Sequence, residues 1–217
     1  MTLPVLLPLK SVNFSKSRLN EVLGNNKKYL IIALLEDMIS LLQNFPEVEI
    51  YLLTKKENSE ILPNGLPVKI IFEDEVDLNG ALEKGITLLK KKENKVLILP
   101  LDLPFINETD IKNIISISQN GCGSVSPSSR GGTSALLLPL DVNFKLQFGE
   151  NSFEKHAAEF QKNNISFKIL NSDTLFYDLD TPEDVLRVLA IKPDTSTYNL
   201  LKDIIPESDN YVTLRGK

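Results

Sequence analysis

The amino-acid sequence predicts an α/β fold in which helices flank a mostly parallel central sheet. Short apolar runs alternate with segments whose apolar residues recur at helical spacing, and this alternation is typical of strands joined by crossover helices. Residues 96–99 are apolar throughout, as expected of a strand buried on both faces. With 217 residues, 42% of them hydrophobic, the chain can bury one core.

Residues 1–119 are expected to supply four strands and three helices. The strands span residues 3–9, 48–54, 68–72 and 96–99, and turn signals at Asn64, Gly65 and Pro67 separate the second from the third. The first helix carries one apolar stripe, formed by Ile31, Leu34, Leu35, Met38, Leu42 and Phe45. The other two helices span residues 78–92 and 107–119, and Asn107 caps the second.

The remainder of the chain is richer in turns. No element is assigned to residues 121–134, which are dense in glycine and serine. Strands are predicted over residues 135–139, 165–170 and 175–179, and a helix over residues 152–162. Another helix begins after Thr181, with Pro182 in its first turn, and ends near Ala190. A weaker helical pattern spans residues 198–205.

We predict one domain over residues 1–191 and a C-terminal extension over residues 192–217, to which no role is assigned. The formal net charge of −5 argues against nucleic-acid and anionic-membrane partners, because both need a basic surface. No apolar stretch approaches the length that crosses a bilayer, and the single cysteine, Cys122, suits a reducing cytoplasm. A homodimer is compatible with these properties.

The loop after the first strand is a candidate phosphate site. In an open α/β sheet the ligand binds beyond the carboxyl ends of the strands, so residues that follow strands take priority. Residues 10–18 contain three cations, Lys10, Lys16 and Arg18, together with hydroxyl groups such as that of Ser17. An arginine fork, lysine charges and backbone N–H groups suit a triphosphate. The alternative interpretation is a solvated basic loop, the commoner outcome for cations in loops.

Two further loops carry carboxylates. Asp102 follows a buried strand and lies between prolines, and Asp178 and Asp180 flank Leu179. On extended backbone, Asp178 and Asp180 project from one face. Two like charges so placed are costly unless a cation lies between them, and carboxylate oxygens suit Mg²⁺, with Asp102 completing the site. Alternatively, Asp180 precedes a helix and is stabilised by the helix dipole.

A fourth candidate is formed by two glycine-containing segments. Residues 130–134 contain Gly131, Gly132 and Thr133, and Gly149 precedes Ser152 at the start of a predicted helix. Glycine permits close backbone approach, and a helix N-terminus would present free N–H groups to a carboxylate or phosphate. The alternative is that both segments are simple turns.

Some motifs are missing from the sequence. It contains no Gly-x-x-x-x-Gly-Lys-Ser/Thr loop, no His-Glu-x-x-His pair and no Gly-x-Ser-x-Gly elbow, which argues against P-loop, zincin and hydrolase functions. The single histidine, His156, lies in a predicted helix. We expect it to be a surface or half-buried residue rather than a catalytic base.

In this order and spacing, the segments resemble the 2-phospho-L-lactate guanylyltransferase family of coenzyme F-420 biosynthesis, from about residue 5 to residue 189. The matching segments are residues 7–10 with 16–19, 77–82, 99–104, 131–137, 148–149 with 152–153, and 178–184. One departure is Ser134, where the family usually has asparagine, so a polar contact to the acceptor or backbone would be shortened.

The resemblance implies a GT-A-like, Rossmann-related nucleotidyltransferase fold. The implied reaction transfers GMP from GTP, with Mg²⁺, to 2-phospho-L-lactate, or to phosphoenolpyruvate or 3-phosphoglycerate, and releases pyrophosphate. Rival functions are a sugar-phosphate nucleotidyltransferase, a GT-A glycosyltransferase and a non-catalytic nucleotide-binding regulator.

The resemblance also implies roles for individual residues. Those implied to contact the nucleotide are Pro8, Lys10, Lys16, Ser17, Arg18, Asn79, Gly80 and Asp102. The acceptor's carboxylate or phosphate would contact Thr133, Gly149 and Ser152, and the metal would be held by Asp102, Asp178 and Asp180. The residues implied to be catalytic are Lys10, Arg18 and Asp102.

Overall fold

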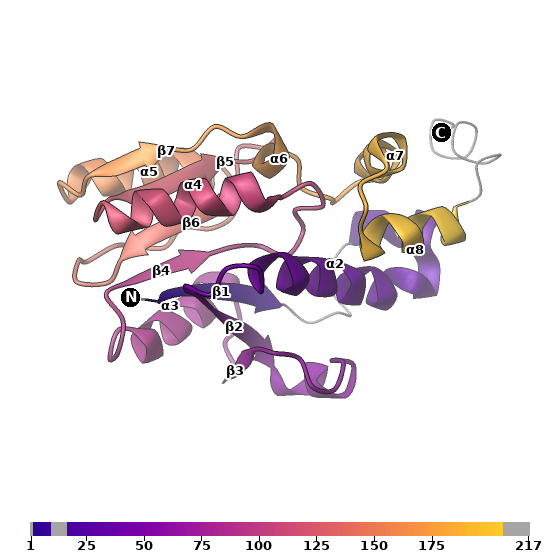
Figure 1. Ribbon diagram of the computed structural model, residues 1–217, viewed down its shortest axis with the longest axis horizontal. Helices are drawn as coiled ribbons and strands as arrows, with labels where there is room; N and C mark the ends of the chain where they lie inside the picture. The colour runs from indigo at the N-terminus through magenta and orange to yellow at the C-terminus, as the bar shows by residue number, and fades with distance from the viewer. Residues whose placement is uncertain (1, 10–16, 206–217) are drawn as a thin grey trace.

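A seven-stranded sheet forms the centre of the molecule, in the order β3-β2-β1-β4-β6-β5-β7 (Figure 1). The computed structural model describes residues 2–9 and 17–205, apart from the side chains of Ser17 and Glu21. The strands are β1 (Leu3–Leu9), β2 (Val48–Lys55), β3 (Lys69–Glu73), β4 (Lys95–Ile98), β5 (Gly123–Pro127), β6 (Thr133–Pro139) and β7 (Phe167–Ile169). Among the described residues, no helix is long and apolar enough to cross a membrane.

The sheet is mostly parallel, as predicted, with one reversed strand. Parallel pairs join β1 to β2, β2 to β3, β1 to β4 and β5 to β7. Strand β6 runs antiparallel to both β4 and β5, because it follows β5 after a short connection rather than a crossover helix. Since Leu136 pairs with Ile98, the beginning of β6 lies at the edge where β4 ends. Thr133, the first residue of β6, therefore lies at the carboxyl edge of the parallel strands.

Helices cover both faces of the sheet (Figure 1). On one face, α2 (Lys27–Leu42) and α4 (Glu108–Gln119) pack on side chains such as Val5 and Leu97. On the other face, α3 (Leu78–Leu89) and α5 (Ser152–Lys162) pack on side chains such as Leu6 and Ile98. The alternation of Leu97 and Ile98 between the two cores confirms that β4 is buried on both faces, as its continuous apolar sequence predicts.

A third core lies at the end of the molecule, where α8 (Ser196–Ile204) packs against both α2 and α7 (Pro182–Ile191) (Figure 1). Its apolar side chains include Leu34 and Leu201. The carboxylate of Asp37 in α2 accepts hydrogen bonds from the backbone N–H groups of Ser196 and Thr197, at 2.7 and 2.9 Å. The extension is thus fixed to α2 as far as the described residues reach. Short helices precede α2: η1 (Ser17–Leu19), α1 (Asn20–Leu23) and η2 (Gly24–Asn26).

Strand β5 lies within the segment that the sequence pattern leaves without an element. Its first residue, Gly123, is a glycine because a Cβ there would lie 2.5 Å from Cε1 of the buried Phe160 ring. The glycine thus makes room for a core aromatic residue and does not mark a loop. Composition alone cannot separate these two uses of glycine.

The predicted strand over residues 175–179 is wrong, because a short helix, α6 (Asp173–Phe176), occupies its start. The buried carboxylate of Asp110 in α4 accepts hydrogen bonds from the hydroxyl groups of Ser172 and Thr174, at 2.6 and 2.7 Å. These contacts hold residues 172–174 in a turn. A further short helix, η3 (Lys56–Glu60), follows β2.

Candidate active site

Three of the predicted loops meet at the carboxyl edge of the sheet. The backbone N–H of Leu179 donates to the carbonyl of Asp102 at 2.8 Å, which joins the loop after β4 to the segment before α7. The N–H of Ser129 donates to the carbonyl of Phe176 at 2.7 Å, which adds the connection between β5 and β6. Residues far apart in the sequence therefore lie together at this edge, where the loop after β4 is expected from the rule of strand ends and the segment before α7 follows α6 (Asp173–Phe176) instead of a strand.

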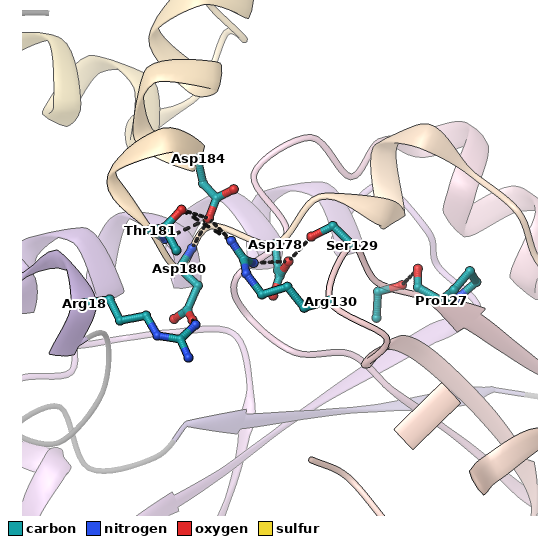
Figure 2. Close-up of polar contacts among 9 residues, drawn as sticks. Arg18, Pro127, Ser129, Arg130, Asp178, Asp180, Thr181 and Asp184 are labelled. Carbon is teal, nitrogen blue, oxygen red and sulfur yellow. Dashed lines mark hydrogen bonds and ion pairs between the residues drawn. The ribbon is translucent and has the colours of Figure 1, made fainter. Parts of the chain in front are cut away.

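Asp178 and Asp180 are each held by a different arginine (Figure 2). Asp178 accepts hydrogen bonds from the hydroxyl of Ser129 at 2.9 Å and from Arg130 at 2.7 Å. Asp180 accepts one from Arg18 at 3.1 Å. The intervening residue Leu179 is fully buried. The carboxylates are thus separated by an inward-pointing leucine, as extended backbone predicts, and both lie within an ionic network.

The centre of this network is Asp184, in the first turn of α7 (Figure 2). Its carboxylate accepts from the N–H groups of Asp180 and Thr181 at 3.0 and 2.8 Å, from the Thr181 hydroxyl at 2.9 Å and from Arg130 at 2.6 Å. Burial alone would raise the pKa of Asp184, but these donors outweigh burial and lower it. Asp184, rather than Asp180, is therefore the acidic residue of the helix cap.

Arg130 bridges two carboxylates, those of Asp178 and Asp184. Burial alone would lower the pKa of Arg130, but the hydrogen bond from Arg130 to Asp184 and the nearby negative charges raise it. The sequence pattern indicates no partner for Arg130, because its neighbours along the chain are glycines and small polar residues and its partners lie about fifty residues away.

The donor chemistry of this edge fits Mg²⁺, since carboxylate oxygens are the ligands that this cation prefers. Within residues 2–9 and 17–205, however, no three acidic, histidine or cysteine side chains converge as a metal site. In the structure, the charges on Asp178 and Asp180 are compensated by Arg130 and Arg18. The joint metal role of Asp102, Asp178 and Asp180 stays a prediction.

A pocket of about 410 Å³ lies beyond the ends of β1, β2 and β3. It is lined by Pro8, Leu9, Leu53, Lys55, Glu73, Glu75, Val76, Asp77, Leu78 and Ala81. Pro8 is a predicted nucleotide contact, whereas the charged residues Lys55, Glu73 and Glu75 are not. The strand-end rule would find them if it were applied to β2 and β3 as well. Lys10, Lys16 and the side chain of Ser17 lie outside the described residues.

Asn79 follows Leu78 of the pocket lining and contacts the turn that contains Gly149. Its side-chain amide donates to the carbonyl of Phe148 at 3.1 Å and accepts from the N–H of Phe148 at 2.8 Å. The next residue, Gly80, donates its N–H to the carboxylate of Asp77 at 2.9 Å, which caps α3. The amide of Asn79 thus fixes the turn, and direct contact of Asn79 and Gly80 with a nucleotide stays a prediction.

Thr133 and Ser152 lie together, as the predicted acceptor site requires, and His156 completes a buried cluster. The hydroxyl of Thr133 lies 3.0 Å from that of Ser152 and 2.9 Å from Nδ1 of His156. All three side chains are buried, and His156 is 0% exposed. The expectation of a surface or half-buried His156 is wrong, because α5 turns this residue towards the rings of Phe144 and Phe148. Burial lowers the pKa of His156 to about 4.

The N-terminus of α5 differs from the expectation of free N–H groups. The N–H of Ser152 donates to the carbonyl of Gly149 at 3.2 Å, and that of Phe153 donates to Gly131 at 3.3 Å. Gly131 and Gly149 have positive φ values of 73° and 127°, which glycine adopts readily. These bonds join the two glycine-containing segments, so the hydroxyl groups of Thr133 and Ser152 are the stronger candidate ligand donors.

Ser134 makes its contact with the backbone. Its hydroxyl lies within hydrogen-bonding distance of the carbonyls of Pro127 and Ser126, at 3.1 and 3.3 Å. This is the point where the register of β5 and β6 shifts. The short side chain therefore stabilises the β-bulge beside the candidate site.

Comparisons with known proteins match one family over most of the chain. Residues 3–210 match the model of the family described as "Guanylyl transferase CofC like", a match that includes α8. The chain is 31% identical over 202 residues to a 2-phospho-L-lactate guanylyltransferase of Methanocaldococcus jannaschii, covering 92% of this chain and 88% of the relative. It is 29% identical over 196 residues to a phosphoenolpyruvate guanylyltransferase of Thermobaculum terrenum, covering 88% and 85%.

A solved structure supports the fold. The crystal structure of a putative nucleotide-diphospho-sugar transferase from Desulfovibrio desulfuricans G20 superposes with a TM-score of 0.78, at 16% identity, and covers 94% of this chain and 95% of that one. At that identity the likeness concerns the fold alone. It agrees with the predicted nucleotidyltransferase architecture.

Proposed function

Because the chain belongs to the CofC-like guanylyl transferase family, we propose that it transfers GMP from GTP to 2-phospho-L-lactate in coenzyme F-420 biosynthesis. Phosphoenolpyruvate and 3-phosphoglycerate carry the same two anionic groups and are the alternative acceptors. One relative is named for phosphoenolpyruvate. A reaction between soluble small molecules in the cytoplasm fits the net charge of −5, which disfavours nucleic-acid and membrane partners.

The observation that carries this proposal is that two candidate sites lie on one sheet edge and share a connection. The pocket of about 410 Å³ beside Pro8 has room for a nucleoside. The hydroxyl pair of Thr133 and Ser152, beside Gly149, offers hydrogen-bond donors to a carboxylate or phosphate. Asn79, which follows the pocket-lining residue Leu78, binds the backbone of Phe148, next to Gly149. This arrangement supports a reaction between a nucleotide and a small acid.

The proposed step is an in-line displacement at phosphorus. A phosphate oxygen of the acceptor forms a bond to the α-phosphorus of GTP, the bond from that phosphorus to the bridging oxygen breaks, and pyrophosphate leaves. A phosphate monoester is already anionic near neutral pH, so no general base is required. Lys10, Lys16 and Arg18 would bind the triphosphate through their positive charges.

The carboxylates of Asp102, Asp178 and Asp180 would hold Mg²⁺, whose charge would stabilise the transferring phosphoryl group and the leaving pyrophosphate. The chain's own residues prepare these carboxylates. Ser129 and Arg130 fix Asp178, and the N–H of Leu179 fixes the backbone of Asp102. Arg18 balances the charge of Asp180.

The test is pyrophosphate release from GTP in the presence of Mg²⁺, with the three acids supplied in parallel. We expect release with 2-phospho-L-lactate, and none with a hexose 1-phosphate. Release with only the sugar phosphate would favour a sugar-phosphate nucleotidyltransferase, and GTP binding without any release would favour a regulator.

The Asp102→Asn variant tests the metal assignment in the same assay. We expect it to abolish turnover while the thermal unfolding transition is retained, because a neutral amide is a poor Mg²⁺ ligand. The matched control is Asp141→Asn, an exposed residue after β6, at the opposite edge of the sheet. Near-normal turnover in Asp102→Asn would remove the metal role.

A further inference from the structure

His156 is a buried titratable residue at the acceptor site to which the proposed reaction assigns no role. Its Nε2 lies 3.0 Å from the backbone N of Gln147, and its Nδ1 lies 2.9 Å from the hydroxyl oxygen of Thr133. The Thr133 oxygen is in turn 3.0 Å from the hydroxyl oxygen of Ser152. A continuous hydrogen-bonded chain therefore runs from the turn before Gly149 to both hydroxyl groups of the acceptor site.

The contact with Gln147 fixes which ring nitrogen of His156 carries the proton. A backbone N–H can only donate, so Nε2 must accept and be unprotonated. A neutral imidazole has its single proton on the other nitrogen. Nδ1 is therefore the donor, and the oxygen of Thr133 is its acceptor. The burial that lowers the pKa of His156 to about 4 keeps the ring in this neutral form near pH 7.

The direction of the bond from His156 has a consequence for the two hydroxyl groups. Thr133 and Ser152 together hold two hydroxyl protons, and only one of them can lie between the two oxygens. The ring cannot accept the other proton, because Nδ1 is already protonated. Neither hydroxyl has another protein acceptor among the described residues. One proton of the pair is therefore available for an anionic ligand.

We propose that His156 is a positioning residue that keeps the Thr133–Ser152 pair as a hydrogen-bond donor to the acid acceptor. This inference rests on the proposed function, which assigns the acceptor to Thr133, Gly149 and Ser152. If Nδ1 accepted instead, the Thr133 proton would turn towards the ring and be lost to the ligand. Because His156 also holds the N–H of Gln147, it fixes the turn that contains Gly149 relative to the hydroxyl pair.

Two amide substitutions separate the contacts of His156. In His156→Asn the side-chain amide reaches about as far as Nδ1, so it can still donate to Thr133. In His156→Gln the amide reaches about as far as Nε2, so it can accept from Gln147 but loses the bond to Thr133. Both variants are neutral and place one amide in the same cavity. A larger effect in His156→Gln than in His156→Asn therefore reports the bond to Thr133, whereas the reverse order would report the bond to Gln147.

The experiment measures pyrophosphate release with GTP and 2-phospho-L-lactate, varying each substrate. We expect His156→Gln to raise the KM for the acid about tenfold, the effect of losing one hydrogen bond to a charged group, while the KM for GTP changes little. His156→Asn should recover most of this loss. In Thr133→Val, which lacks the hydroxyl, adding His156→Gln should cause little further change in the KM for the acid. The control is Glu154→Gln, an exposed residue on α5.

The outcomes separate the inference from the function on which it rests. Equal KM values for the acid in the wild type, His156→Gln and His156→Asn would overturn the positioning role and leave the guanylyl transfer intact. Equal rises in the KM for both substrates, in both variants, would also overturn it, since they indicate a general packing role. A wild-type enzyme that binds GTP but is inactive with all three acids would overturn the proposed function itself.

Discussion

Replacing Asp184 by alanine should destabilise the protein far more than replacing its neighbour Glu183. The Asp184 side chain is 10% exposed and accepts four hydrogen bonds, two from backbone N–H groups, one from Thr181 and one from Arg130. Glu183 is exposed in the same helical turn. Both residues carry a negative charge in the first turn of α7, so what distinguishes them is the set of hydrogen bonds that the Asp184 carboxylate accepts.

The expected magnitude follows from the lost contacts. The net value of an ordinary hydrogen bond is about 1 kcal/mol, and half-buried donors left without an acceptor add to the loss, so Asp184→Ala should cost about 3 kcal/mol. For a domain of this size each kcal/mol lowers Tm by about 2–4 °C, which gives a fall of roughly 6–12 °C. Thermal unfolding followed by circular dichroism at pH 7 measures it. A fall within about 2 °C of that in Glu183→Ala would refute the reasoning.

The Tm difference between the wild type and Asp184→Ala should decrease as the pH falls. The donors lower the pKa of Asp184 in the folded state below its ordinary value of 3.8, against the effect of burial. A carboxylate with a depressed folded pKa stabilises the protein above the unfolded pKa and loses that contribution as pH falls through the folded value. The Tm difference between the wild type and Asp184→Ala should be complete at pH 7 and shrink below about pH 4. A difference that stayed constant down to about pH 3 would contradict the assignment.

Two more predictions concern the core and the connection between the candidate sites. Gly123→Ala should lower the free energy of unfolding by about 1–3 kcal/mol in urea, because its Cβ would lie 2.5 Å from the Phe160 ring. Adding Phe160→Leu to the same chain should recover part of this loss. A Gly123→Ala variant as stable as the wild type would exclude the clash. Asn79→Ala should lower kcat/KM about tenfold, because it removes both hydrogen bonds to the backbone of Phe148. The control Glu83→Ala, at an exposed position of α3, should leave kcat/KM unchanged. Unchanged kinetics in Asn79→Ala would show that the turn containing Phe148 and Gly149 holds without the Asn79 amide.

The sequence predicts the parts of this molecule whose pattern is local. The apolar run of β4 and the stripe of α2 specify their elements because burial alone determines those residues. The strand-end rule is equally local, and it places Asp102 at the carboxyl edge because Asp102 follows the apolar run of β4. Asp178 follows no strand, and its segment is joined to that edge by the bond from Leu179 to Asp102, which no sequence pattern reveals.

The remaining features depend on partners that are distant in the sequence. Gly123 resembles a loop residue until Phe160 is placed against it. Similarly, the alternating apolar residues of 175–179 indicate a strand, whereas the buried carboxylate of Asp110 holds the preceding residues in a turn. His156 is the clearest case, since its importance follows from contacts with Thr133 and Gln147 that no periodicity reveals.

The two arginines at the carboxylate edge differ in how readily they can exchange partners. The side chain of Arg18 is 63% exposed, and an exposed ion pair such as that with Asp180 is worth about 0–1 kcal/mol, so Arg18 can turn towards a triphosphate at little cost. Arg130 is 34% exposed, and its partner Asp184 is only 10% exposed, so releasing Arg130 would leave a buried carboxylate without its counter-ion. In the proposed reaction, Arg18 can therefore serve the ligand, whereas Arg130 keeps the carboxylate loop in place throughout.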